Sequence, residues 1–209
     1  SPYGRFDAEN MTYSASVLWR CRKLHTDFIL GDFNARFGQG LALWNGLSLS
    51  SLSSPSAIMK NPTGLSQTSS FTGNYAFTGA GVETSIKSLA VSAFLAFPGI
   101  KTTFRNVKVM PALNLSYYWR YGQVAATYVS GKVSIDTRMC IRGVDVFAET
   151  VYDCLNRVPA ALCGTVFPAG EHLSMAAMLR YYPVSLNADH PGAICSNTSA
   201  RNEYGTTFT

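Results

Sequence analysis

Apolar and polar residues alternate with a period of two along much of this chain. In the first such stretch the two sets are Met11, Tyr13, Ala15, Val17 and Trp19 on one side and Thr12, Ser14, Ser16 and Arg20 on the other, with Leu18 as an apolar exception. Successive side chains of a β-strand point to opposite faces of its sheet. A period of two therefore predicts amphipathic strands, each with one apolar face.

The alternation returns often enough to predict an all-β, antiparallel fold. We expect roughly nine strands, in segments 11–20, 29–37, 71–83, 89–97, 107–121, 123–129, 141–152, 158–166 and 173–186. Segments 71–83 and 89–97 are predicted to pair as a hairpin. Segment 107–121 is longer than the usual strand of about five or six residues. Such length is typical of strands that cross a bilayer obliquely, which need about nine to eleven residues.

No segment has the length and hydrophobicity of a transmembrane helix. The longest nearly apolar stretch, Leu89 to Ile100, contains Ser92, Pro98 and Gly99, and it is shorter than the roughly 20 residues that a spanning helix needs. Backbone polar groups cannot remain unpaired in hydrocarbon, so the other structure that can span a membrane is a closed β-barrel.

The scarcity of charge favours a barrel in a membrane over a soluble sheet. Charged residues make up 14% of the chain and apolar residues 47%, whereas soluble domains carry about 25% charge. The polar faces of the predicted strands hold Ser, Thr and Asn rather than Lys and Glu. We therefore predict one antiparallel transmembrane β-barrel over residues 1–209, and a soluble β-sandwich binding module remains the alternative.

One connection is too long for an ordinary turn. Residues 45–70, after the second predicted strand, are rich in Ser and contain Pro55, Asn61-Pro62 and Gly64. Most loops have about four to six residues. We expect a long Ser/Pro-rich loop that packs in or over the lumen.

The charged residues of the polar faces are candidates for a lumen network. The set is Asp32, Arg36, Arg120, Asp145, Glu149 and Arg180. Asp145 and Glu149 lie on alternate positions of one strand, so their side chains share a face. Two carboxylates could act as general acid and base of a glycan or lipid hydrolase. We favour an ion network in a lumen, because a carboxylate inside a barrel is tolerated when it is paired with a counter-charge or hydrated.

Aromatic residues gather near the ends of predicted strands, where outer-membrane barrels carry interfacial girdles. The candidates are Trp19, Trp44, Tyr117, Trp119, Tyr121 and Tyr181.

Metal, cofactor and nucleic-acid sites are not indicated. The five cysteines form no C-x-x-C pair, the three histidines are isolated, and no G-x-S-x-G occurs. A disulfide between Cys154 and Cys163 remains an alternative if the compartment is oxidising. Net charge is +5, but the basic residues are scattered and form no groove with aromatics. We therefore expect no catalytic residue, no metal and no cofactor.

Several motifs resemble a Bacteroidota outer-membrane family. Ile29-Leu30-Gly31-Asp32-Phe33, followed by Phe37-Gly38-Gln39-Gly40-Leu41 and by Trp44-Asn45-Gly46, is similar to that family's "GDY, FGQGL, W and G" pattern. Its members join a helix-hairpin-helix (ComEA-like) region to a large β-barrel. Residues 71–79, 143–149, 180–182 and 202–205 resemble further family blocks, although Thr78 stands where Arg is common and Ala148 replaces Gly.

The resemblance implies an outer-membrane location and a barrel, and it implies no activity. The helix-hairpin-helix segment is missing from the chain, so DNA binding is not carried over. The resemblance and the alternation of apolar and polar residues together lead us to expect an incomplete, non-enzymatic barrel of a bacterial outer membrane. We expect that barrel to be a channel or a subunit of a larger assembly for protein insertion, export or nutrient import. Its expected partners are lipid and other outer-membrane or periplasmic proteins.

Overall fold

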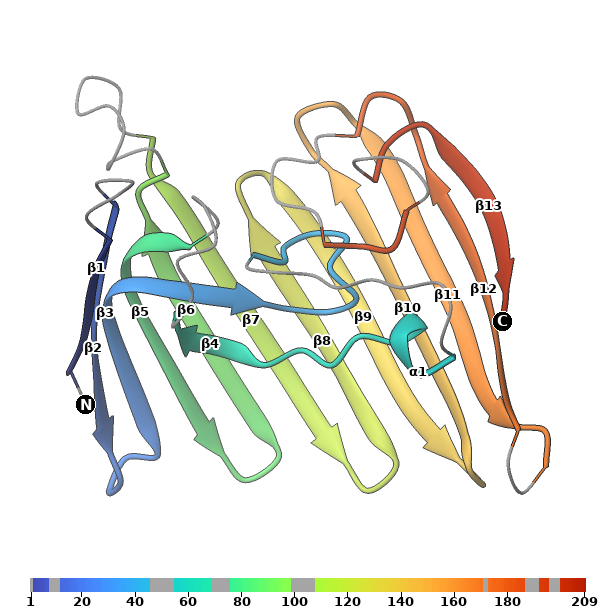
Figure 1. The fold of residues 1–209 in the computed structure, drawn as a ribbon, viewed down its shortest axis with the longest axis horizontal. Coiled ribbons are helices and arrows are strands. Elements are labelled where there is room, and N and C mark those ends of the chain that lie inside the picture. The colour runs from blue at the N-terminus through green and yellow to red at the C-terminus, as the bar shows by residue number, and fades with distance from the viewer. Residues whose placement is uncertain are drawn as a thin grey trace.

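The computed structural model describes residues 2–7, 12–45, 55–68, 76–98, 108–170, 173–186, 192–195 and 200–209. It contains one antiparallel sheet of 13 strands and a single helical turn (Figure 1). The strands are β1 (Pro2–Asp7), β2 (Thr12–Cys21), β3 (Thr26–Arg36), β4 (Gly64–Gln67), β5 (Phe77–Ile86), β6 (Leu89–Ala96), β7 (Met110–Trp119), β8 (Gly122–Val129), β9 (Lys132–Ile141), β10 (Val144–Asp153), β11 (Val158–Pro168), β12 (Ser174–Tyr182) and β13 (Glu203–Phe208), and the turn is α1 (Pro55–Ile58).

The strands follow one another across the sheet in sequence order, apart from β4, which pairs with the end of β3. The prediction of an all-β antiparallel fold is confirmed. Within the described part of the chain, no pairing joins β1 to β13, so the observed sheet is open at these two edges. Closure into a barrel is therefore a proposal.

Most strands were predicted close to where they lie, and the predicted hairpin is β5–β6. Residues 71–75 of that prediction lie outside the described residues. Four strands, β1, β4, β9 and β13, lie outside the nine predicted segments. β1 and β4 are short, with 6 and 4 residues, and β9 loses its apolar alternation from Thr137 onward. The long connection consequently follows the third strand, not the second, and it contains α1 and β4.

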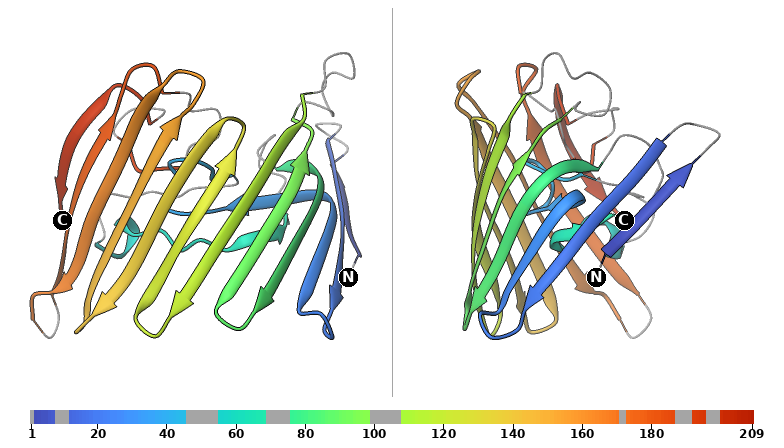
Figure 2. Two further views of the ribbon diagram at one scale, coloured as in Figure 1. Left: turned by 180° about the vertical axis from the view of Figure 1, so that it is seen from behind. Right: turned by 90° about the vertical axis from the view of Figure 1, so that its left-hand side faces the viewer.

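The chain separates from β2 at Gly31, in the middle of β3, and stays paired with β5 as far as Phe33. Gly31 has a φ of 95°, and a Cβ atom there would fall on the backbone carbonyl oxygen of Ala15 in β2. Only glycine adopts this conformation and allows this approach without strain. Beyond the bend the chain crosses one face of the sheet, and residues 55–68 return across the same face (Figures 1 and 2). We call residues 32–45 and 55–68 the inner segment, and the face that they cover the inner face.

An apolar core lies between the inner segment and the sheet. Phe33 packs edge-on against Phe94, with ring centroids 5.3 Å apart, and Phe77 lies 5.8 Å from Phe94. Leu41, Leu43 and Ile58 of the inner segment and Phe147 and Val151 of β10 belong to the same buried cluster. Burial of these side chains fixes the inner segment on the sheet, because each contributes about 1.5–3 kcal/mol on leaving water.

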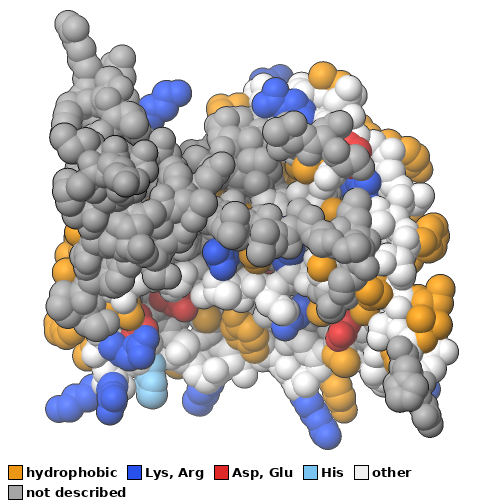
Figure 3. All heavy atoms as spheres, in the orientation of Figure 1, with side chains coloured by type: hydrophobic (Ala, Val, Ile, Leu, Met, Phe, Trp, Pro, Cys, Tyr) orange, Lys and Arg blue, Asp and Glu red, His pale blue; other side chains and the backbone are white. Residues whose placement is uncertain are grey.

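In a soluble sheet the buried face is apolar and the exposed face is polar. The two faces of β6–β12 have the opposite arrangement. The inner face buries polar side chains, namely Ser92, Asn114, Ser116, Gln123, Thr127, Lys132, Ser134, Asp136, Glu149, Asp153 and Arg180. The opposite, outer face exposes large apolar ones, among them Leu113, Leu115, Tyr117, Val124, Tyr128, Val133, Ile135, Tyr152, Leu179 and Tyr181. In Figure 3 hydrophobic side chains accordingly project along the outline of the sheet.

Candidate functional site

A buried carboxylate on β10 holds the first part of the inner segment. Glu149 is 1% exposed. Its Oε2 accepts hydrogen bonds from the backbone N–H groups of Gln39 (2.6 Å) and Leu41 (3.0 Å), and its Oε1 accepts one from Ala42 (3.0 Å). A buried charge is tolerated when such donors replace its water. Glu149 therefore anchors the Phe37–Trp44 loop to the sheet.

Two glycines shape the loop around this carboxylate. Gly38 and Gly40 have φ angles of 58° and 85°. A Cβ atom on Gly38 would lie 2.8 Å from Oε2 of Glu149, so a side chain there would push the carboxylate away. The carbonyl of Gly40 accepts hydrogen bonds from the N–H groups of Gly192 and Ala193, both at 2.9 Å. The loop thus joins β10 to the segment that precedes β13.

The two halves of the inner segment are joined to each other by Gln39 and Lys60. The Gln39 amide donates to the Lys60 carbonyl (3.2 Å), and the Lys60 N–H donates to Oε1 of Gln39 (2.8 Å). The Lys60 Nζ lies 4.7 Å from the ring centroid of Trp44, which also has the Arg36 guanidinium at 5.7 Å. Burial lowers the pKa of Lys60 to about 8, although Cys195 and Glu149 favour its charged form.

A second carboxylate, on β5, holds the other half of the inner segment. Oε2 of Glu83 accepts hydrogen bonds from the Leu65 N–H (3.0 Å) and from the Ser92 hydroxyl (2.9 Å). Gly64, with a φ of 65°, lies against the same carboxylate. The inner segment is thus attached to the sheet by Glu149 at one end and by Glu83 at the other.

A small polar cavity lies between the inner segment and β5–β9. Its volume is about 160 Å³. Its polar walls include Glu83, Ser92, Asn114, Ser116, Gln123 and Asp136, and residues of the inner segment close it on the other side. Asp136 is 2% exposed, and among the described residues its Oδ1 has no hydrogen-bond partner.

The predicted charge network separates into independent contacts. Asp32 is buried at the bend of β3, where its carboxylate accepts from the Ala15 N–H (2.9 Å) and the Thr78 hydroxyl (2.6 Å). Arg36 is half-buried in the inner segment and donates to the Asn45 carbonyl (3.2 Å). Arg180 on β12 is paired with Glu203 on β13, and both side chains are buried.

The remaining two members of that set lie near the short turns. Arg120 is exposed in the β7–β8 turn, 5.4 Å from the ring centroid of Tyr121. The alternation of β7 ends at Trp119, so Arg120 does not point into the sheet's interior. Asp145 is half-buried beside the β9–β10 turn, four positions from Glu149 along β10. The structure therefore does not bring Asp145 and Glu149 together as a pair.

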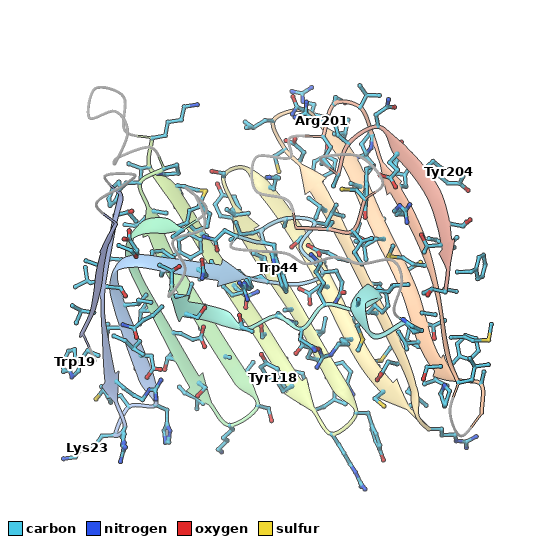
Figure 4. All side chains as sticks on the ribbon, viewed as in Figure 1. Trp19, Lys23, Trp44, Tyr118, Arg201 and Tyr204 are labelled. Carbon is cyan, nitrogen blue, oxygen red and sulfur yellow. The ribbon has the colours of Figure 1, made fainter. Side chains whose placement is uncertain are left out.

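The aromatic candidates divide into two groups. Trp19, Tyr117, Tyr121 and Tyr181 are exposed and Trp119 is half-buried. Trp19 stacks on Phe28, and Tyr117 stacks on Trp119. Trp44, in contrast, is buried inside the fold (Figure 4), and the cationic groups of Arg36 and Lys60 lie near its ring. It does not lie at a rim, because the chain turns inward at Gly31.

Glu83, Asp136 and Lys60 were not identified from the sequence. Glu83 and Asp136 occupy alternate, inward positions of β5 and β9, so the alternation itself was a usable signal. Lys60 had none, because it lies in a segment with no regular pattern.

The cysteines Cys21, Cys140, Cys154, Cys163 and Cys195 are free thiols, including the pair considered for a disulfide. Three or more His, Cys, Asp or Glu side chains do not gather as a metal site anywhere in the described residues. Over the same residues, no helix is both long and apolar enough to cross a membrane.

Comparison of the chain with protein-family models, curated proteins and solved structures gave no match. The resemblance to the Bacteroidota barrel family therefore remains a prediction.

Proposed function

We propose that the chain forms the wall and the internal plug of a β-barrel in a bacterial outer membrane, with a non-enzymatic role. The observation that carries this proposal is the reversal of polarity across β6–β12. On β7, Asn114 and Ser116 are buried while Leu113 and Leu115 are exposed, at 49% and 48%. A soluble sheet would lose free energy by this arrangement, whereas hydrocarbon around the outer face makes it favourable.

The layout of the turns supports the same proposal. The β5–β6, β7–β8 and β9–β10 connections are two-residue turns at the lower end of Figure 1, and the β2–β3 turn at that end has four residues. At the opposite end the β8–β9 and β10–β11 turns have two and four residues, but the three longest separations between paired strands also fall there: 40 residues of chain between β3 and β5, 13 between β6 and β7, and 20 between β12 and β13. Outer-membrane barrels have short turns on the periplasmic side and long loops outside. We therefore assign the lower end to the periplasm.

The inner segment would occupy the lumen of this barrel. Glu149 and Glu83 hold it at two places, and Phe33, Leu41 and Ile58 pack it against the sheet. We infer a closed resting state, suited to a gated channel or to a membrane-embedded subunit of a larger assembly. Insertion in lipid also requires that the edges of β1 and β13 be paired, with each other or with further strands, because an open edge is not tolerated there.

The hydrolase alternative has less support. Glu149 is buried, and both of its oxygens accept backbone hydrogen bonds. A general acid or base must reach its substrate within hydrogen-bonding distance. The position of Glu149 favours anchoring of the inner segment.

The tryptophans allow a direct test of the membrane proposal. Trp19 is 64% exposed on the outer face, whereas Trp44 is 9% exposed inside the fold. We expect brominated lipids to quench the fluorescence of a variant that retains only Trp19. A variant that retains only Trp44 is the matched control and should be quenched far less.

Equal, weak quenching of the two variants, with the wild-type protein soluble in the absence of detergent, would contradict the proposal and favour the β-sandwich module. Membrane insertion together with steady conductance in planar bilayers would retain the barrel and contradict the closed state.

A further inference from the structure

The cavity between the inner segment and β5–β9 is a candidate binding site for a small ligand. It is enclosed by the inward side chains of β5–β9 on one side and by Gly38 and residues 62–64 on the other. Tyr118, which is 45% exposed, also lines it. Figure 4 places Tyr118 toward the short-turn end of the sheet. The cavity therefore communicates with the surface at that end.

The lining of the cavity carries negative charge, and the Arg138 guanidinium compensates Asp136 only in part, from outside the lining. Glu83 and Asp136 both line the cavity, and none of the described residues that line it is Lys or Arg. The other polar walls, such as Asn114 and Gln123, are neutral. A positively charged occupant would therefore gain free energy from two carboxylates in a region of low dielectric constant.

The buried Oδ1 atom of Asp136 is separate evidence for a ligand in the cavity. Asp136 is 2% exposed, and its Oδ1 has no hydrogen-bond partner among the described residues. An unsatisfied buried acceptor costs about 1–3 kcal/mol, and more when it is charged. Buried polar atoms are normally satisfied by protein, water or ligand, and a donor inside the cavity would satisfy this oxygen.

The volume limits the size of that donor. One water needs at least about 10–15 Å³ of cavity volume, so 160 Å³ is enough for several waters or for an organic molecule of a few heavy atoms. We propose that this cavity binds a small aliphatic amine through its ammonium groups, with Asp136 and Glu83 as the acceptors. A diamine would match the two carboxylates in charge. This inference does not depend on the membrane proposal, since it rests only on the cavity.

The amide and hydroxyl groups around the carboxylates suit the same class of ligand. An ammonium group has three donors and no acceptor, and the carbonyl oxygen of Gln123 or Asn114 can take the donors that the carboxylates leave. Tyr118 adds a ring at the surface end of the cavity, which favours a cation by cation–π attraction. An uncharged ligand of equal size would place no positive charge beside the two carboxylates.

The test is isothermal titration of the purified full chain with 1,4-diaminobutane at constant ionic strength. Titrations with 1-butanol and with sodium and potassium chloride serve as ligand controls. We expect saturable one-site binding of the diamine, with at least tenfold weaker binding of butanol and of both inorganic cations. Binding of sodium or potassium as tight as that of the diamine would overturn the organic-amine assignment.

Variants place the binding in the cavity. Asp136→Asn should weaken diamine binding at least tenfold, whereas Asp145→Asn, a carboxylate on the neighbouring strand outside the cavity, should leave it unchanged. Ala90→Leu fills the cavity while keeping both carboxylates, so it should also abolish binding and decides the question if Asp136→Asn does not fold. Unchanged diamine affinity in folded Ala90→Leu, or no saturable heat in the wild type, would overturn the proposal and leave a water-filled cavity.

Discussion

The carboxylate of Glu149 accepts a hydrogen bond from the backbone N–H of Leu41 at 3.0 Å, although the two residues are 108 positions apart in the chain. The same side chain also receives the N–H groups of Gln39 and Ala42. A loop without regular secondary structure is thus ordered by one side chain of the sheet. The carboxylate is buried, so the three N–H donors stabilise it in place of water, and the carboxylate in turn orders the loop.

Glu149→Ala is expected to release the Phe37–Trp44 loop without unfolding the sheet. Hydrogen bonds to a charged group contribute about 1.5–3 kcal/mol each, and the substitution removes all three and leaves a void. We expect faster hydrogen exchange at the amides of Gln39, Leu41 and Ala42, together with a lower midpoint of thermal unfolding. Exchange measured by mass spectrometry on peptides from residues 37–45 checks this.

The matched control for that experiment is Asp145→Ala on the same strand. Asp145 is half-buried near a turn and makes no contact with the loop among the hydrogen bonds of the described residues. It should leave exchange of the loop at the wild-type rate. If Glu149→Ala and Asp145→Ala had equal effects, Glu149 would not be the anchor of the inner segment.

Gly38→Ala should destabilise the fold more than Gly143→Ala does. Both glycines have positive φ angles, 58° and 82°, so both substitutions carry a backbone penalty of about 1–2 kcal/mol. Only at Gly38 would the new Cβ meet the Glu149 carboxylate, whereas nothing lies within 4 Å at Gly143. The difference between the two thermal midpoints therefore measures the clash, and equal midpoints would argue against a tightly fitted carboxylate.

The buried ion pair between Arg180 and Glu203 should control the attachment of β13. Removal of one partner of a buried pair costs about 3–5 kcal/mol, because the other charge is left uncompensated. We expect Glu203→Gln to increase hydrogen exchange in residues 203–208. The double variant Arg180→Met/Glu203→Leu should be more stable than either single variant. A double variant whose loss equals the sum of the two single losses would show that the residues do not act as a pair.

Lys60 should make the stability of the fold depend on pH in the alkaline range. Burial lowers its pKa from 10.5 to about 8 in the folded state. Between pH 8 and 10.5 the unfolded chain therefore binds more protons than the folded chain, and the free energy of unfolding rises with pH over that window. Each unit of difference corresponds to about 1.4 kcal/mol, so the rise is at most about 3 kcal/mol. At pH 7 the ammonium is charged in both states and the cost of its burial is fully present.

Comparison of wild type with Lys60→Met isolates this contribution from other groups that titrate at high pH. The variant should be more stable than wild type at pH 7 and should lose part of the rise between pH 8 and 10.5. Denaturant unfolding at several pH values checks this. Parallel curves for the two proteins would mean that burial of Lys60 does not shift its pKa.

The period of two was sufficient to predict nine of the 13 strands but not the path of the chain. In the predicted segment 107–121 the alternation puts Leu113, Leu115 and Tyr117 on one face and Asn114 and Ser116 on the other, and the structure has them so. The inward turn at Gly31 could not be predicted, because it depends on the close approach of a neighbouring strand. That turn brings Trp44 into the interior instead of to a rim.

The site was harder to predict than the fold, since its contacts are made by backbone groups. Glu149 and Asp32 were recognised as inward carboxylates, but an ion-pair network was expected around them. Both accept from backbone N–H groups instead, and a sequence contains no signal for which amides are free. Arg180 was assigned a charged partner, and Glu203 could be identified only from the pairing of β12 with β13.

Exposed apolar residues of the outer face allow a direct test of the membrane proposal. Ile135 is 60% exposed in the middle part of β9, so Ile135→Arg would place a charge in hydrocarbon at a cost of about 2–4 kcal/mol near the bilayer midplane. Leu155→Arg is the control, because Leu155 is 72% exposed in the β10–β11 turn and should accept a charge at little cost. Unfolding in lipid vesicles should therefore require less denaturant for Ile135→Arg than for Leu155→Arg. In a soluble protein both positions would be exposed to solvent, where substitutions usually change stability by less than about 0.5 kcal/mol. The two variants would then unfold at the same denaturant concentration.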